Sequence, residues 1–175
     1  MKLLVAGVGK VLRGDDGFGV AVAERLLSGT IPDGVRVMDM GIGGIHLVQE
    51  LMGGVDALII VDALHLDRPP GTVLVFRPDV RDVRSLTLWE RHDELADMHY
   101  ATPGRALMLG RALEVMPERT LIVGCQPADA ESLSEGLSAP VRRAVERAAA
   151  EVRRVVSGLG IPWSEPPFAP GAAER

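Results

Sequence analysis

Acidic side chains follow three apolar runs of this sequence, at positions where they could gather at one edge of a sheet. These acids are Asp15, Asp16, Asp39 and Asp62. Carboxylates that converge with little basic charge around them are costly unless a cation neutralises them. Carboxylates and an imidazole together suit zinc, nickel or a similar borderline metal. The pattern therefore indicates a metal site, although no local motif such as HExxH identifies one by itself.

The adjacent acids Asp15 and Asp16 lie in a glycine-rich loop between the apolar run 2–6 and a helical pattern at 20–27. We expect one of them to cap the helix N-terminus, where a carboxylate accepts hydrogen bonds from free N–H groups and suits the helix dipole. A single cap needs a single carboxylate. The second acid is therefore available for another role.

The glycines of the same loop suggest a different function, dinucleotide binding. Gly7 and Gly9 begin a G-x-G-x-x-G fingerprint, but Leu12 occupies the position of the third glycine. Two carboxylates would also face the pyrophosphate at the helix N-terminus, where neutral N–H groups are needed. Both departures argue against a nucleotide cofactor.

Further candidate residues are a cysteine and the loop histidines. Cys125 follows an apolar strand pattern, so we expect a small core residue rather than a nucleophile, which would need a histidine base beside it. His65 lies close to Asp62 in the sequence and is a candidate to orient a metal ligand through a hydrogen bond. His92 and His99 lie in a charged segment with little periodicity, which we expect to be mainly loop over the same sheet edge.

Composition excludes several classes of protein. The net charge of −5 and the aromatic content of 3% leave no basic surface and few stacking side chains for a nucleic acid. A single cysteine cannot form an internal disulfide and suits a reducing compartment. No apolar run approaches the length of a membrane span, and the N-terminus lacks the pattern of a signal peptide. We therefore expect a cytoplasmic protein that contacts no membrane.

Apolar runs and helical patterns alternate along the chain, which is typical of an α/β fold. Strands are predicted at 2–6, 35–38, 57–61, 72–76 and 120–123, and helices at 20–27, 45–52, 102–115 and from 138 to about 155. The pattern predicts a three-layer α/β/α domain of the phosphorylase/hydrolase-like kind, with a mostly parallel, twisted five-stranded sheet. Residues 63–71 are too few for a helical crossover, so the strand at 72–76 is predicted to run antiparallel at an edge.

One domain is predicted over residues 1–160. The tail at 161–175 is rich in proline and alanine and is predicted to be flexible. In an open α/β sheet, ligands bind beyond the carboxyl ends of the strands, which is where the acids lie.

Several motifs together resemble one known family. The stretch GVGKVLRGDDGFG is similar to the signature G-x-G-N-x-L-x-x-D-[DE]-x-x-G of the nickel–iron hydrogenase maturation proteases. The resemblance continues in register over residues 2–157, and its further motifs are DMGIGG at 39–44, IIVDA at 59–63, VGCQP at 123–127 and GLSAPV at 136–141. It implies a metal-dependent endopeptidase that removes the C-terminal extension of a hydrogenase large-subunit precursor after nickel insertion.

The resemblance also implies roles for individual residues. Asp16, Asp62 and His99 match the family residues that contact the metal and carry catalysis; His92 competes with His99 for the third position. The metal is expected to be nickel supplied by the precursor, with zinc or a similar divalent metal as the alternative.

A second set of residues is implied in substrate binding. Asp39, Gly41 and Gly43 match a family loop linked to substrate choice, although Asp39 fits a turn-forming role at a strand end equally well. Lys10 replaces the usual asparagine of the signature, and it could contact a substrate carboxylate or neutralise the acids. This departure keeps open a non-catalytic alternative, in which the protein binds the same precursor as a metal-loading checkpoint or assembly factor. The partner is expected to be the hydrogenase large-subunit precursor, and the protein is expected to be a monomer.

Overall fold

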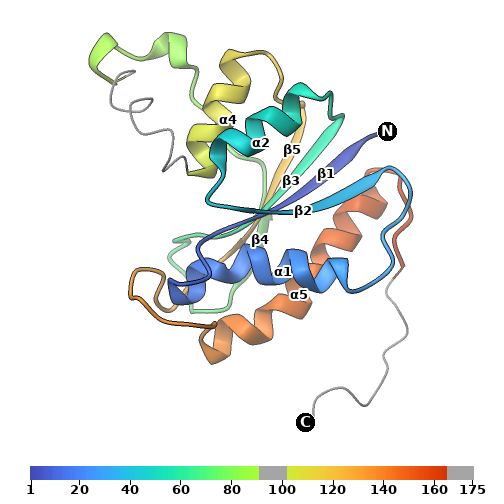
Figure 1. Cartoon of the computed structure of the whole chain (residues 1–175), viewed down its shortest axis with the longest axis vertical. Helices are drawn as coiled ribbons and strands as arrows, with labels where there is room; N and C mark the ends of the chain where they lie inside the picture. Colours follow the sequence, from blue (N-terminus) through green and yellow to red (C-terminus); the bar gives the residue numbers. More distant parts are fainter. Residues whose placement is uncertain (91–101, 165–175) are drawn as a thin grey trace.

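The computed structural model describes residues 1–90 and 102–164, which form a five-stranded sheet between two layers of helices (Figure 1). The strands are β1 (Leu3–Val8), β2 (Val35–Gly41), β3 (Ala57–Ala63), β4 (Val73–Phe76) and β5 (Arg119–Cys125). The helices are α1 (Phe18–Leu27), α2 (Gly44–Met52), α4 (Pro103–Ala112) and α5 (Ala139–Gly158), with short 3-10 turns η1 (Gly14–Gly17) and η2 (Val83–Ser85). The predicted fold class is confirmed.

The strand order is β2-β1-β3-β5-β4, and β2, β1, β3 and β5 run parallel. Strand β3 is the centre of this sheet and its residues 57–62 are all buried. Helices α1 and α5 cover one face, and α2 and α4 cover the other (Figure 1). Continuous burial of both faces explains why the sequence of β3 is apolar without alternation.

Strand β4 is antiparallel and lies at the edge of the sheet, as the sequence predicts. Its hydrogen-bonded neighbour is β5, which lies between β4 and β3. The connection from β3 to β4 contains no helix, so the chain turns back at the carboxyl edge of the sheet. A short antiparallel strand at the edge is the result.

The start of α1 lies unusually close to the sheet, because two glycines face each other there. A Cβ on Gly7 would stand 2.3 Å from the Gly19 carbonyl oxygen, and a Cβ on Gly19 would stand 2.1 Å from that of Val61. No larger residue fits either position without moving backbone. The close approach holds the loop between β1 and α1 over the carboxyl ends of β1 and β3.

The end of the described chain packs against the domain. Trp163 is 8% exposed; its backbone N–H donates to Ser157 Oγ at 3.0 Å and its Nε1 donates to the Thr30 carbonyl at 3.0 Å. Ile161 also packs against the core. The prediction of a flexible tail from residue 161 is therefore wrong for these residues. The Trp163 ring is buried and its N–H has a hydrogen-bond acceptor, which together stabilise the packed position. Residues 165–175 lie outside the described residues.

Over the two described segments, no helix combines the length and the apolar character that crossing a bilayer requires.

Candidate active site

A cavity of about 610 Å³ opens at the carboxyl ends of β1 and β3, on the side of the sheet that carries α4. Its floor is apolar and includes Ile60, Ile122 and Leu107. Ionisable side chains also line it; these are Lys10, Asp16, Asp62, Asp79, Arg81 and Arg105. The cavity therefore combines an apolar surface with charged groups of both signs.

Asp62 is a buried acid in this cavity. It lies near the end of β3 beside Gly124 of β5 and is 5% exposed. Burial, which has the largest effect, and the nearby Asp16 charge together raise the pKa of Asp62 to about 8, and a hydrogen bond from the Ala63 N–H partly opposes them. Asp16 and Asp62 come from the loops and ends of neighbouring strands, and their charges interact across the cavity. The predicted meeting of these two acids is thus found.

The loop that carries Asp16 is closed by its own backbone. The Lys10 N–H donates to Asp16 Oδ2 at 2.8 Å, and the Arg13 N–H donates to the Lys10 carbonyl at 2.9 Å. Gly9 has a φ of +143°, and a Cβ there would stand 1.8 Å from the Asp16 carbonyl oxygen. The bond to Asp16 uses the backbone of Lys10, so the replacement of asparagine by lysine leaves it intact.

Asp15 points away from the cavity and holds the neighbouring loop. It is 1% exposed. Its Oδ2 accepts from the Ala128 N–H at 2.8 Å, the Asp129 N–H at 3.2 Å and Ser138 Oγ at 2.9 Å, and its Oδ1 accepts from the Ser138 N–H at 2.7 Å. The adjacent acids therefore divide two tasks: Asp15 fixes the loop, and Asp16 faces the cavity.

The expected cap of α1 by one of these acids is wrong. Helix α1 begins at Phe18 after Gly17, and no side chain caps it. The 3-10 turn η1 occupies the residues between the loop and the helix, so both carboxylates lie before the helix start and find other donors.

The loop after β2 is tied to the loop after β1. Asp39 Oδ1 accepts from the Gly41 N–H at 2.8 Å, and the Gly41 carbonyl accepts from the Gly9 N–H at 2.9 Å. Gly41 and Lys10 line the cavity, whereas Asp39 and Gly43 are not among its lining residues. Gly43 precedes α2 and donates its N–H to Met40. Asp39 therefore has the turn-forming role. Substrate binding by Asp39, Lys10 and the two glycines stays a prediction.

None of the three candidate histidines is found at the cavity among the described residues. His92 and His99 lie outside the described residues, so the third predicted metal ligand is untested. His65 is exposed and is not among the residues that line the cavity. Within residues 1–90 and 102–164, no group of three or more His, Cys, Asp or Glu side chains is arranged to hold a metal ion. The described part of the chain thus offers the Asp16–Asp62 pair and no complete ligand set.

Cys125 is a core residue, as predicted. It is fully buried, and burial raises the pKa of its thiol to about 11. A thiol that resists ionisation is a poor nucleophile. The next residue, Gln126, was not assigned a role by the sequence: its Oε1 accepts from the Leu66 N–H at 2.6 Å and so fixes the loop after β3.

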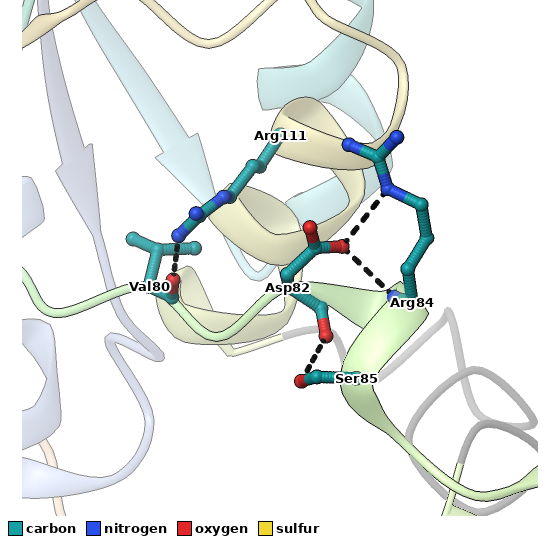
Figure 2. A network of polar contacts seen from close by, with 5 residues as sticks. All are labelled: Val80, Asp82, Arg84, Ser85 and Arg111. Carbon is teal, nitrogen blue, oxygen red and sulfur yellow. Dashed lines mark hydrogen bonds and ion pairs between the residues drawn. The ribbon is translucent and has the colours of Figure 1, made fainter.

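One wall of the cavity is anchored by contacts that the sequence did not identify (Figure 2). Arg111 of α4 donates to the carbonyl of Val80, a cavity residue. Two residues on, Asp82 Oδ1 accepts from the Arg84 N–H at 2.8 Å, and the Asp82 carbonyl accepts from Ser85 Oγ at 2.7 Å. The Arg111 bond holds the segment around Val80 against α4, and the two Asp82 bonds begin η2. The signal available in the sequence was Asp82 itself, a residue type that favours helix starts.

Comparisons with known proteins give relatives along most of the chain. A family model described as hydrogenase maturation protease matches residues 20–155. The hydrogenase expression/formation protein HupM of Azotobacter chroococcum is 37% identical over 160 residues, which are 91% of this chain and 73% of HupM.

Solved structures agree with these relatives. The hydrogenase maturating endopeptidase HybD of E. coli has a TM-score of 0.73 at 28% identity, covering 93% of this chain and 96% of HybD. A hydrogenase 2 maturation peptidase of a Thaumarchaeota archaeon has a TM-score of 0.65 at 32% identity, covering 90% and 99% of the two chains.

Proposed function

The chain belongs to the hydrogenase maturation protease family, and from this premise we propose that it removes the C-terminal extension of a nickel–iron hydrogenase large-subunit precursor after nickel insertion. The observation that carries the proposal is the Asp16–Asp62 pair at the carboxyl ends of the central strands, inside a cavity with an apolar floor. The partner is a protein substrate, and the proposed location of the reaction is the cytoplasm.

The acid pair suits a cation that arrives with the substrate. Two neighbouring carboxylates, one of them buried, repel each other, and a divalent ion between them relieves that repulsion. We take this ion to be the nickel of the precursor, with zinc or a similar metal as the alternative. His99 precedes the cavity residue Thr102 by three residues in the sequence, which supports it as the third ligand. Two carboxylates and one imidazole without a thiolate suit a metal that stays with the substrate.

Different residues of the cavity bind the metal-loaded region and the substrate segment. Asp16 and Asp62 hold the metal-loaded region of the precursor at the sheet edge. When bound by these residues, the metal would supply polarisation of the scissile carbonyl or activation of a water, or it would serve only as proof of loading. The apolar floor around Ile60 and Ile122 receives the substrate segment beside the bond that is cut. Lys10 and Gly41, which line the cavity on the β1 and β2 side, orient that segment.

Mass spectrometry of a large-subunit precursor tests this function. The precursor is prepared in nickel-loaded and nickel-free forms and incubated with and without this protein, which is expected to act as a monomer. We expect loss of a C-terminal peptide only from the loaded form. Cleavage of both forms would show that cleavage does not require nickel in the precursor. Binding without cleavage of either form would replace the protease by the metal-loading checkpoint.

A further inference from the structure

Three large apolar side chains are exposed on the loop that follows the cavity residue Lys10 and on the segment that pairs with this loop. Val11 is 55% exposed, Leu12 is 61% exposed and Leu133 is 83% exposed. Single apolar residues on a surface need no explanation, but adjacent ones beside a site indicate an interaction surface. Val11, Leu12 and Leu133 are called the apolar ridge below. Leu12 belongs to the glycine and acid stretch that closes around Asp16, yet it does not contribute to the core.

Backbone hydrogen bonds bring the members of the ridge together from distant parts of the sequence. Arg13 and Ser134 form a parallel bridge, the Gly14 N–H donates to the Ser134 carbonyl at 2.9 Å, and the Ser134 N–H donates to the Leu12 carbonyl at 3.3 Å. The last of these bonds joins the peptide between Leu133 and Ser134 to the Leu12 carbonyl, so the backbones of Leu12 and Leu133 lie side by side.

The ridge is also held in place by the contacts that hold Asp16. The Lys10 N–H donates to Asp16 Oδ2, and Asp15 accepts hydrogen bonds from both Ala128 and Ser138, on either side of Leu133 in the sequence. Side chains presented on a fixed backbone lose little freedom on binding, which makes them efficient anchors. A partner that binds the ridge therefore costs little conformational entropy, whereas binding to a flexible loop would cost the entropy of ordering that loop.

The position of the ridge indicates what occupies it. Lys10 and Asp16 both line the cavity, and the chain between them carries Val11 and Leu12 to the outside. A substrate segment that enters the cavity therefore brings the rest of its protein against this loop. Exposed charged residues stand next to the ridge in the sequence, because Arg13 follows Leu12 and Glu131 and Glu135 lie two residues before and after Leu133. An apolar centre with a polar rim is the usual composition of a protein interface.

Resting on the proposed function, we propose that the apolar ridge docks an apolar surface on the folded body of the precursor, next to the segment that enters the cavity. Docking supplies affinity for the protein substrate, and the acid pair supplies the chemistry. The ridge therefore governs KM, and Asp16 and Asp62 govern kcat.

The test compares Leu12→Ser/Leu133→Ser with Met52→Ser and the wild type. Met52 is 65% exposed at the far end of α2 and is the matched control. Processing of the nickel-loaded precursor is followed at increasing precursor concentration, and the dissociation constant is measured separately with each protein. We expect KM and the dissociation constant to rise at least tenfold for the double variant, with kcat within about twofold, and no change for Met52→Ser.

Each other outcome decides between the two proposals. Unchanged KM and affinity in the double variant would overturn the docking role and leave the protease standing. Ridge-dependent binding without any cleavage by the wild type would overturn the protease and leave the docking role. A wild type that neither binds nor cuts the precursor would overturn both. Sedimentation that shows a wild-type dimer, dissociated by the two serines, would assign the ridge to a second copy of this chain instead.

Discussion

Asp62 shows at the residue scale what the site costs the fold. It is held at the end of a central strand, almost fully buried, with Asp16 as a charged neighbour. Among the described residues, no basic side chain acts on its pKa, and burial together with the Asp16 charge raises that pKa to about 8. A group with such a raised pKa destabilises the folded protein when it ionises. Retention of this acid in a core position is easier to explain by chemistry than by packing.

The pH dependence of unfolding tests that cost. The unfolded pKa is 3.8 and the folded one about 8, so the folded state retains a proton that the unfolded state has lost. Stability therefore falls as the pH rises between about 4 and 8. Asp62→Asn removes this fall, so its melting temperature should exceed that of the wild type at pH 8 and approach it at pH 4. Each kcal/mol relieved corresponds to roughly 2–4 °C.

Thermal unfolding of the free proteins in buffers from pH 4 to pH 8 gives the comparison. Asp33→Asn is the control, because Asp33 is exposed in the turn before β2. A constant difference between Asp62→Asn and the wild type across the pH range would contradict the account.

At the scale of elements, Asp15 joins parts of the chain that are far apart in sequence. It connects the loop after β1 to the loop after β5 and to Ser138, the residue before α5. The same connection presents both Asp16 and the apolar ridge. The glycine contact between β1 and α1 holds the other side of this loop. Two fixed sides explain how this loop can hold Asp16 in a defined position at the cavity.

Replacement of Asp15 tests this connection. Asp15→Ala leaves the N–H groups of Ala128, Asp129 and Ser138 without their acceptor, at a cost of about 1–3 kcal/mol for each group that stays buried. Ser138→Ala removes one hydroxyl donor and leaves the backbone bonds, at a cost of about 1 kcal/mol. Urea unfolding should therefore show a loss for Asp15→Ala at least twice that for Ser138→Ala. Equal losses would mean that the backbone donors do not depend on Asp15.

At the scale of the whole molecule, the sequence was most informative where the signal is local. The apolar run of β3 and the short connection before β4 predicted a central and an edge strand, and both were found. The pairing of Asp16 with Asp62 followed from strand ends that meet at one edge. An apolar run without alternation indicates that both faces of a strand are buried, and the length of a connection indicates whether the next strand runs parallel or antiparallel.

The rest depended on contacts between distant residues. Asp15 finds its donors more than 100 positions away, and nothing near Asp15 in the sequence indicates them. Trp163 packs through partners at Thr30 and Ser157, so a tail of loop-forming composition is partly folded. The apolar ridge likewise exists only because residues 13 and 134 pair. Composition and periodicity carry no record of such contacts.

The most direct test of the central claim is the processing of nickel-loaded precursor by Asp16→Asn, measured as the mass of the large subunit over time. Asparagine keeps an oxygen that can accept from the Lys10 N–H, so the loop is preserved while the charge beside Asp62 is removed. Asp33→Asn again serves as the control. We expect no loss of the C-terminal peptide with Asp16→Asn and full processing with Asp33→Asn. Processing by Asp16→Asn at the wild-type rate would contradict the assignment of the acid pair as the active site.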